Sequence, residues 1–157
     1  MEHWFLAMLH LKTAMNWQLC HLWEVDRLEK AIITKDPLAV PTMEDPNMGS
    51  FIVFQGKVRN HSENGEVQAI EYSAYEELAL SQLRKIVQET EEKYSVTVYA
   101  AHRIGRLNVG ETALVVATLS SHRQEGFLAT MEIIDRIKKE VPIWKKEILT
   151  DGRAVWL

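Results

Sequence analysis

Cationic side chains stand at both ends of one predicted helix, which spans residues 122–141. Arg123 lies at its start, and Lys138 lies one turn from its end, before Pro142 stops it. At about 100° per residue, Lys138 falls near the middle of a face that carries the apolar residues Phe127, Met131, Ile134, Ile137 and Val141. Burying an unpaired ammonium group costs free energy, so this position predicts that a partner chain or an anionic ligand meets Lys138.

The start of the same helix is suited to binding an anion. A helix N-terminus presents free backbone N–H groups, and Arg123 beside His122 adds a bidentate grip on phosphate or carboxylate. The sequence leaves an alternative open, in which Ser120 or Ser121 caps the helix beside a solvated His122–Arg123 pair. A second cationic segment, Gly56-Lys57-Val58-Arg59, follows a predicted strand, and by itself it also fits an ordinary surface loop.

Arg123 and Lys138 are too far apart to hold one small ligand within a single chain. They are 15 residues apart, which is about 22 Å along a helix that rises about 1.5 Å per residue. If both serve one anionic site, the second end comes from another copy of the chain, which predicts a symmetric dimer with composite sites. The alternative is that the two ends serve separate sites.

The composition excludes several classes of protein. A chain of 157 residues that is 46% hydrophobic and 25% charged forms one globular domain with a proper core. Its net charge of -4 argues against general binding to nucleic acid or to membrane surfaces. The single Cys20 excludes an internal disulfide and fits the reducing cytoplasm. His61, His102 and His122 lack the spacing of a helical zinc pair, so we expect no metal site.

The first 30 residues differ from the rest of the chain. They are rich in Trp, Leu and Met, but they lack a basic start and are interrupted by His10, Lys12 and His21, which makes a signal peptide or a membrane span a poor interpretation. We expect residues 1–30 to form a helical extension that packs on the protein or on a second subunit. Residues 31–157 are then the single functional domain.

The remaining pattern predicts an α+β fold. Apolar residues recur with helical spacing over residues 75–94 and 122–141. Short β-rich runs occupy residues 50–55, 67–72, 96–102, 112–119, 144–149 and 153–157, with a polar loop at 61–65 and a turn at 108–111. Two long helices with such strands indicate a mixed, mainly antiparallel sheet covered by helices.

Four motifs together resemble the large, catalytic subunit of molybdopterin synthase. In chain order they are Gly56-Lys57-Val58-Arg59-Asn60-His61, Ala101-His102-Arg103-Ile104-Gly105, Ser121-His122-Arg123, and Lys138 with Pro142-Ile143-Trp144-Lys145-Lys146-Glu147. The resemblance runs from about Ile32 to the C-terminus and leaves residues 1–30 without a counterpart. It implies an α/β-hammerhead-like fold that forms a dimer.

The function that the resemblance implies is that of a cytoplasmic sulfurtransferase of molybdenum cofactor biosynthesis. In that family a small ubiquitin-like subunit brings sulfur as a C-terminal Gly-Gly thiocarboxylate, and two copies of each subunit form a heterotetramer. The sulfur goes to cyclic pyranopterin monophosphate, and two rounds make the dithiolene of molybdopterin. The resemblance therefore implies no catalytic cysteine and no permanently bound cofactor.

The resemblance also assigns roles to individual residues. Lys138 corresponds to the essential lysine and Lys145 to a second catalytic lysine. The corresponding substrate-binding residues are Lys57, Val58, Arg59, His122, Arg123, Lys138, Lys145, Lys146 and Glu147. Two roles for Lys138 stay open at this point, a transient amine nucleophile and a proton shuttle.

Two other functions fit parts of the sequence. A non-catalytic module that docks a ubiquitin-like tail in a cationic groove explains the same periodicity, but it gains little from a lysine on an apolar face. A small phosphate-ester-binding enzyme that acts alone needs a general base or a metal cluster, and the sequence pattern offers neither.

Overall fold

The computed structural model describes residues 29–157, which form an α+β fold of two helices and nine strands. The predicted extension over residues 1–30 lies outside the described residues, apart from Glu29 and Lys30. In chain order the elements are β1 (Ala31–Thr34), β2 (Ser50–Lys57), β3 (His61–Ser62), β4 (Gly65–Ala74), α3 (Glu76–Tyr94), β5 (Thr97–Arg103), β6 (Gly105–Asn108), β7 (Thr112–Ser120), α4 (Arg123–Glu140), β8 (Ile143–Leu149) and β9 (Ala154–Trp156).

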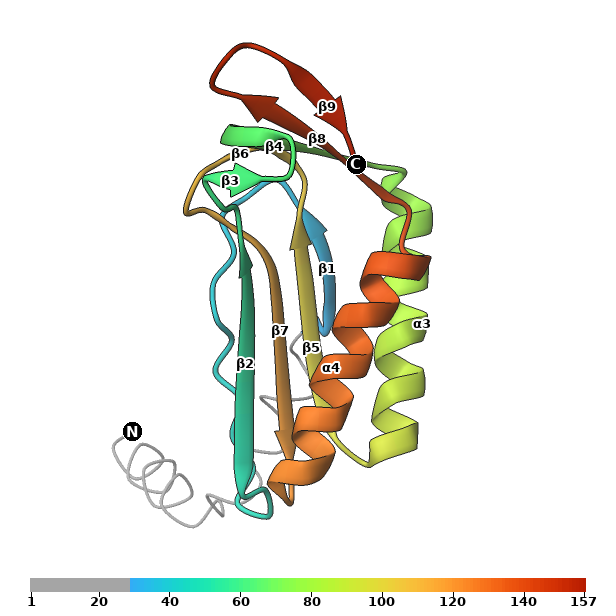
Figure 1. Cartoon of the computed structure of the whole chain (residues 1–157). Helices are drawn as coiled ribbons and strands as arrows, with labels where there is room; N and C mark the ends of the chain where they lie inside the picture. Colours follow the sequence, from blue (N-terminus) through green and yellow to red (C-terminus); the bar gives the residue numbers. More distant parts are fainter. Residues whose placement is uncertain (1–28) are drawn as a thin grey trace, which may run out of the picture.

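A four-stranded sheet in the order β1-β5-β7-β2 forms the body of the molecule (Figure 1). β1 runs parallel to β5, whereas β5–β7 and β2–β7 are antiparallel, so the predicted mixed and mainly antiparallel arrangement is confirmed. α3 and α4 lie side by side on one face. The segment between β1 and β2 covers the other face, where Leu38, Met43 and Met48 pack on it. Burial on both faces explains why the central strands β5 and β7 carry continuous apolar runs, over residues 98–101 and 113–117, instead of an alternating pattern.

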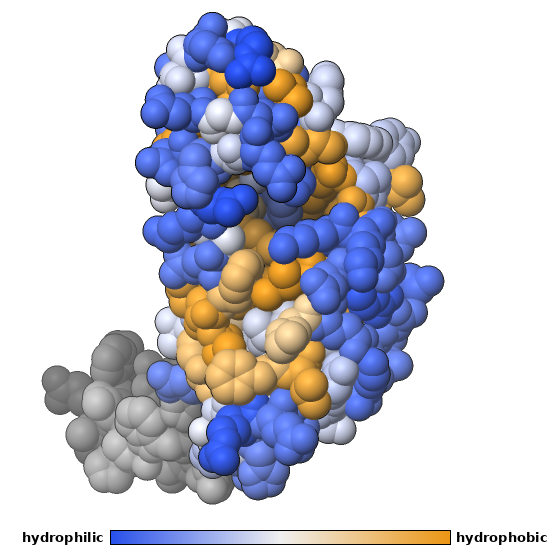
Figure 2. All heavy atoms as spheres, viewed as in Figure 1, coloured by the Kyte–Doolittle hydropathy of each residue, from blue (hydrophilic) through white to orange (hydrophobic). Residues whose placement is uncertain are grey.

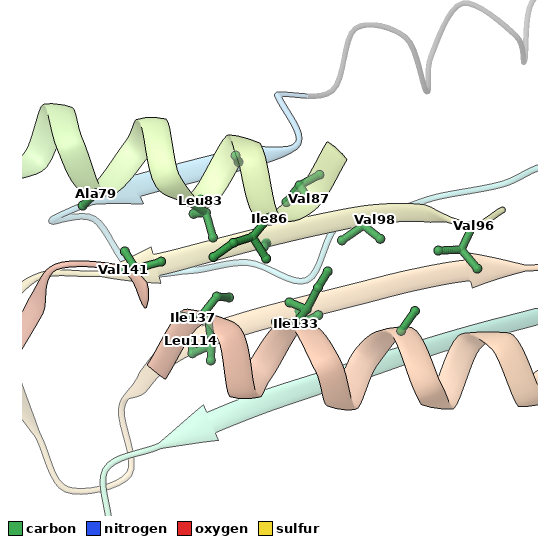
Figure 3. Packing of buried hydrophobic residues seen from close by; sticks show 14 residues of the cluster. Ala79, Leu83, Ile86, Val87, Val96, Val98, Leu114, Ile133, Ile137 and Val141 are labelled. Carbon is green, nitrogen blue, oxygen red and sulfur yellow. The ribbon is translucent and has the colours of Figure 1, made fainter. Parts of the chain in front are cut away.

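The main core fills the space between this sheet and the helices (Figure 3). Leu83 and Ile86 of α3 meet Ile133 of α4 over the central strands, and all three side chains are fully buried. Gly126 lets α4 approach the sheet, because a Cβ there would lie 2.6 Å from the Ser120 Oγ atom. The close approach fixes α4 against β7 and β2 along the turn that begins the helix.

The buried face of α4 differs from the predicted one. The residues that face the core are Gly126, Ala129, Thr130, Ile133 and Ile137. Phe127 and Met131 are 56% and 64% exposed, so the prediction that they form the buried stripe is wrong. In the first part of α4 the small residues Gly126, Ala129 and Thr130 face the sheet because they let the helix lie close to it, and Ile133 and Ile137 fill the core further along. Phe127 and Met131 therefore form an exposed apolar flank on the side that also carries Lys138.

A second, five-stranded sheet packs across one end of the first (Figure 1). Its central strand β4 pairs with β3, β6 and β8, and β9 continues from β8. Val67, Leu107 and Leu149 form the centre of its own small core. The sequence analysis missed β1, β3 and β6, which have only two to four residues each and depend on their pairing partners.

Candidate active site

A cavity of about 580 Å³ opens where the two sheets meet the C-terminal end of α4. Figure 2 shows the surface hollowed between the upper part of the molecule, formed by the second sheet, and the lower part. The charged and polar side chains that line it are Gln55, Lys57, Arg59, His61, Tyr72, His102, Lys138, Lys145 and Glu147. Apolar walls come from Phe54, Ile70, Leu114, Ile137 and Ile143. The cavity thus combines apolar surface with an excess of positive charge, as suits a flat anionic ligand.

β8 supplies three of the lining residues, Ile143, Lys145 and Glu147, because side chains alternate along a strand. Lys145 and Glu147 line the cavity, whereas Lys146 is not among the lining residues. The Lys146 ammonium pairs with Glu71 at 2.6 Å and lies 5.2 Å from the centre of the Trp156 ring. The salt bridge lowers the pKa of Glu71. The geometry therefore gives Lys146 a structural contact, and it separates this residue from the predicted substrate-binding group.

Lys138 reaches the cavity from the last turn of α4. Its side chain is exposed, so it is not a lysine buried on an apolar stripe as the sequence suggested. Ile137 beside it is buried in the main core and anchors this turn. Lys138 is therefore held at the rim of the cavity, where its ammonium group is open to a ligand.

Glu147 is the one carboxylate side chain that lines the cavity among residues 29–157, and it is only 4% exposed. Its Oε2 atom accepts hydrogen bonds from the Ser62 hydroxyl and from the Asn64 side-chain amide, each at 2.8 Å. Both donors belong to the β3–β4 hairpin, which also carries His61. The buried carboxylate thus ties this hairpin to β8 at the wall of the cavity.

His102 and Tyr72 form a part of the cavity wall that the sequence analysis did not assign. Their rings meet edge to face with centroids 5.2 Å apart. Burial lowers the pKa of His102 to about 4; a hydrogen bond to the Arg103 carbonyl opposes this shift, and the charge of Lys145 adds to it. Burial, helped by the charge of Glu147, raises the pKa of Tyr72. Both groups are therefore uncharged at neutral pH.

The register of the second sheet brings Tyr72 to this place. Tyr72 of β4 lies opposite Lys145 of β8, so the two residues meet although 73 positions separate them in the sequence. The only sequence signal for His102 was its place in the Ala101–Gly105 motif. No signal in the sequence marked Tyr72 beyond the alternation of its strand.

Residues 57–59 lie partly in the wall of the cavity and partly in a hydrophobic core. Lys57 and Arg59 line the cavity, while Val58 is buried in the small core of the second sheet. Backbone hydrogen bonds of Val58 to Glu111 and Gly110 hold this turn in place. Val58 thus positions its two cationic neighbours, and its own side chain is not part of the cavity lining.

His122 and Arg123 lie at the opposite end of α4 and do not line the cavity. The helix begins at Arg123 without a side-chain cap, and the Ser120 hydroxyl donates a hydrogen bond to the His122 carbonyl. The alternative in which the Ser120 side chain caps the N-terminus of this helix is therefore not supported. His122 and Arg123 are exposed, and within one chain they are separated from Lys138 by the length of the helix.

The cavity offers mainly lysine amines, the Arg59 guanidinium group and the uncharged rings of Tyr72 and His102. Among residues 29–157, no three side chains of His, Cys, Asp or Glu are grouped as a metal site requires. None of the helices in this part of the chain is long and apolar enough to cross a membrane. The three lysines Lys57, Lys138 and Lys145, placed beside apolar walls, are suited to binding an anion and to stabilising negative charge that develops in a reaction.

Comparisons with known proteins agree with this geometry. A protein from Thermoplasma volcanium called molybdopterin synthase catalytic subunit is 40% identical over 112 residues, which cover 71% of this chain and 82% of that protein. The crystal structure of molybdopterin synthase from Staphylococcus aureus matches with a TM-score of 0.77 at 32% identity, over 83% of this chain and 98% of that one.

A third similarity concerns the fold alone. A chain in the complex of subunits 1 and 2 of molybdopterin-converting factor from Helicobacter pylori matches with a TM-score of 0.59 at 24% identity, over 70% of this chain and 72% of that one. The sequence model that describes the MoaE protein matches residues 31–140. That match includes the strands and helices that carry Lys57, Arg59, His102 and Lys138 to the cavity, and by it the chain belongs to the MoaE protein family.

Proposed function

We propose that this chain is the catalytic subunit of a molybdopterin synthase and transfers sulfur to cyclic pyranopterin monophosphate. The observation that carries the proposal is the meeting of Lys138 and Lys145 in one cavity with Lys57 and Arg59. These four cations come from three separate segments of the chain. A phosphate-bearing heterocycle needs such a cationic cavity with apolar walls, and the names of the relatives agree with this assignment.

The sulfur donor in this proposal is the C-terminal Gly-Gly thiocarboxylate of a small ubiquitin-like subunit. The described residues that line the cavity include no cysteine, which supports a sulfur that arrives on another molecule. The fold-related Helicobacter pylori chain belongs to a complex of two subunits, and we propose an analogous complex for this chain. No cofactor is needed in addition to these two substrates.

Lys138 and Lys145 have different tasks in the proposed reaction. Lys138, at the rim, acts on the carbonyl carbon that bears the sulfur. As a nucleophile, its amine forms a C–N bond to this carbon, the C–S bond breaks so that the sulfur stays with the pterin, and water then hydrolyses the amide. As a proton shuttle, Lys138 takes the proton of a water that attacks the same carbon and breaks the same C–S bond. Lys145, on β8 inside the cavity, stabilises the oxyanion that develops on that carbonyl. A covalent bond between the Lys138 amine and the terminal glycine of the partner, detected by mass spectrometry, distinguishes the nucleophile from the shuttle.

The active unit in the proposal is a symmetric dimer. Phe127 and Met131 leave an exposed apolar flank along α4, and Figure 2 shows hydrophobic side chains gathered on the face over β2 and α4. A second copy that covers this flank brings His122 and Arg123 of one protomer toward Lys138 of the other. Each cavity is then completed by the partner, and two small subunits make a heterotetramer. The single cysteine supports the cytoplasm as its location.

Reconstitution tests the proposed reaction. The protein is mixed with a thiocarboxylated small subunit and cyclic pyranopterin monophosphate, and the dithiolene product is measured. We expect Lys138→Ala to abolish product while the complex with the small subunit still forms on a sizing column. Lys139→Ala is the matched control, because Lys139 is an exposed neighbour that does not line the cavity. Full turnover by Lys138→Ala would refute the assignment.

Mixed dimers test whether the site is composite. Lys138→Ala and Arg123→Glu each inactivate a homodimer, but a mixed dimer of the two retains one cavity with intact Lys138 and intact Arg123 if these come from different protomers. We expect about half of the wild-type activity in the mixed dimer, since one of two sites is restored. Activity no higher than in the parent homodimers contradicts the composite site. A complex that binds both substrates without product points instead to a binding module.

A further inference from the structure

His102 presents an unpaired acceptor atom to the cavity. Its Nδ1 atom lies 2.8 Å from the Arg103 carbonyl oxygen. A carbonyl only accepts hydrogen bonds, so Nδ1 carries the proton and donates, and Nε2 is left with its lone pair. Among the described residues no hydrogen bond involves Nε2. The only fully buried side-chain polar atom without a partner in this part of the chain is Glu125 Oε2, so Nε2 is accessible from the cavity that His102 lines.

The orientation of the His102 ring is fixed by its surroundings. The side chain is 8% exposed, its Nδ1–H bond holds one edge, and the Tyr72 ring packs against it at 67° between ring planes. An imidazole held in this way has one tautomer and one direction for its lone pair. It does not need to reorganise when a ligand binds.

Four charged side chains of the lining, those of Lys57, Arg59, Lys138 and Lys145, can only donate hydrogen bonds. The lining side chains that can accept are those of Gln55, His61, Tyr72, His102 and Glu147. One Glu147 oxygen already accepts two hydrogen bonds, and the Gln55 amide oxygen accepts one from the Thr112 hydroxyl at 3.4 Å. His102 Nε2 has no partner among the described residues and, with the proton on Nδ1, can only accept. It is therefore a fixed and free acceptor for an N–H donor of a ligand.

We propose that His102 is a specificity-determining residue, whose Nε2 atom accepts a hydrogen bond from a ring N–H group of the bound pterin. This inference rests on the proposed function. The apolar side chains of Phe54, Ile70 and Leu114 line the same cavity and offer surface for a flat heterocycle whose edge carries N–H donors. The cations then hold the phosphate, while His102 recognises the ring edge. A ligand with a ring oxygen in place of that N–H leaves the acceptor unpaired and binds more weakly.

The test compares two substitutions of His102 with a control in the core. His102→Leu removes the acceptor, whereas His102→Gln retains a carbonyl oxygen near the position of Nε2. Val87→Ala is the control for a general loss of stability, because Val87 is buried on α3 and does not line the cavity. Thermal unfolding first verifies that each variant is folded. Calorimetry then gives the dissociation constant of cyclic pyranopterin monophosphate and, separately, that of the small subunit with an ordinary C-terminal carboxylate.

We expect His102→Leu to raise the dissociation constant of the pterin about tenfold, as the loss of one hydrogen bond to a buried donor predicts. His102→Gln should remain within about threefold of the wild type, and Val87→Ala should not change binding. In the full reaction, His102→Leu should raise KM and leave kcat nearly unchanged, because the hydrogen bond from the pterin to His102 is present in both the ground state and the transition state. Binding of the small subunit should be the same in all four proteins.

Nitrogen NMR of the wild-type protein gives a measurement that does not depend on a variant folding. The Nε2 resonance of His102 should have the shift of an unprotonated nitrogen and should move when the pterin is added. An unmoved resonance, an unchanged pterin dissociation constant in folded His102→Leu, or a loss confined to the small subunit overturns the role of His102. A wild-type protein that does not bind the pterin at all overturns the proposed function instead, together with this inference.

Discussion

The hydrogen bond between Asn64 and Glu147 should couple the β3–β4 hairpin to β8, and a double-mutant cycle measures that coupling. The Asn64 side-chain amide has this one hydrogen bond among the described residues, at 2.8 Å, so Asn64→Ala removes it cleanly. Glu147→Ala removes the acceptor together with its second bond, which comes from Ser62. The cycle isolates the Asn64–Glu147 interaction from the other effects of each substitution.

The expected coupling follows from the geometry. A hydrogen bond to a charged group contributes about 1.5 to 3 kcal/mol to stability. Glu147 is 4% exposed, which favours a strong interaction, but Asn64 is half-buried and its amide can bind water in the single variant. We therefore expect a coupling near the lower limit, about 1.5 kcal/mol. The single substitution of Glu147 is less informative, because it also removes the cost of burying a charge.

Urea unfolding of the wild type, the two single variants and the double variant provides the four free energies. The matched control is the cycle between Glu66 and Thr150, whose side chains are exposed and 3.4 Å apart. We expect its coupling to stay below about 0.5 kcal/mol. A coupling of Asn64 with Glu147 as small as in the control would refute the conclusion that the buried carboxylate holds the hairpin against the cavity.

Three further predictions concern the helix, the histidine and β8. Gly126→Ala should lower the free energy of unfolding by about 1 to 3 kcal/mol, because the new Cβ would lie 2.6 Å from the Ser120 hydroxyl. This loss should exceed the gain from the better helix propensity of Ala. An unchanged free energy of unfolding in urea would contradict the close approach of α4 to the sheet. Because the pKa of His102 falls from 6.5 to about 4 on folding, the unfolded chain binds the proton more readily. The stability of the wild type should therefore fall by about 3 kcal/mol relative to His102→Gln as the pH decreases from 6.5 to 4, and parallel pH profiles would argue against this burial. Lys145→Ala should abolish sulfur transfer, whereas Lys146→Ala should retain it. Equal losses of activity in the reconstituted assay would contradict the conclusion that Lys145 and Lys146 lie on opposite faces of β8.

Both helices and six of the nine strands in the described residues could be predicted from the sequence. Periodicity predicted helices at 75–94 and 122–141, and the structure has them at Glu76–Tyr94 and Arg123–Glu140. The six predicted strands are all present within a few residues. Apart from β9, which has three residues, these elements are long enough for their own apolar pattern to identify them, whereas the missed short strands exist because a neighbouring strand pairs with them.

The candidate site was predictable in part. Lys57, Arg59, Lys138, Lys145 and Glu147 stand together as expected from the resemblance, although they come from distant segments. The resemblance placed Lys146 in the pocket beside Lys145, whereas the structure puts the two on opposite faces of β8, since neighbours on a strand face opposite sides. Tyr72 and His102 were not predictable as a pair, since their contact depends on how β4 and β5 are placed relative to each other.

The sequence by itself determined which residues share a face of each element and how far apart the cations of α4 lie. The tertiary structure decided what covers each face. Phe127, Met131 and Lys138 do share one side of α4, but Gly126 and Ala129 turn the other side to the sheet. The physical reason is that periodicity is a property of one helix, whereas burial depends on how closely the helix can approach its neighbours. Close approach in the first part of α4 requires small side chains there, so Phe127 and Met131 remain on the surface.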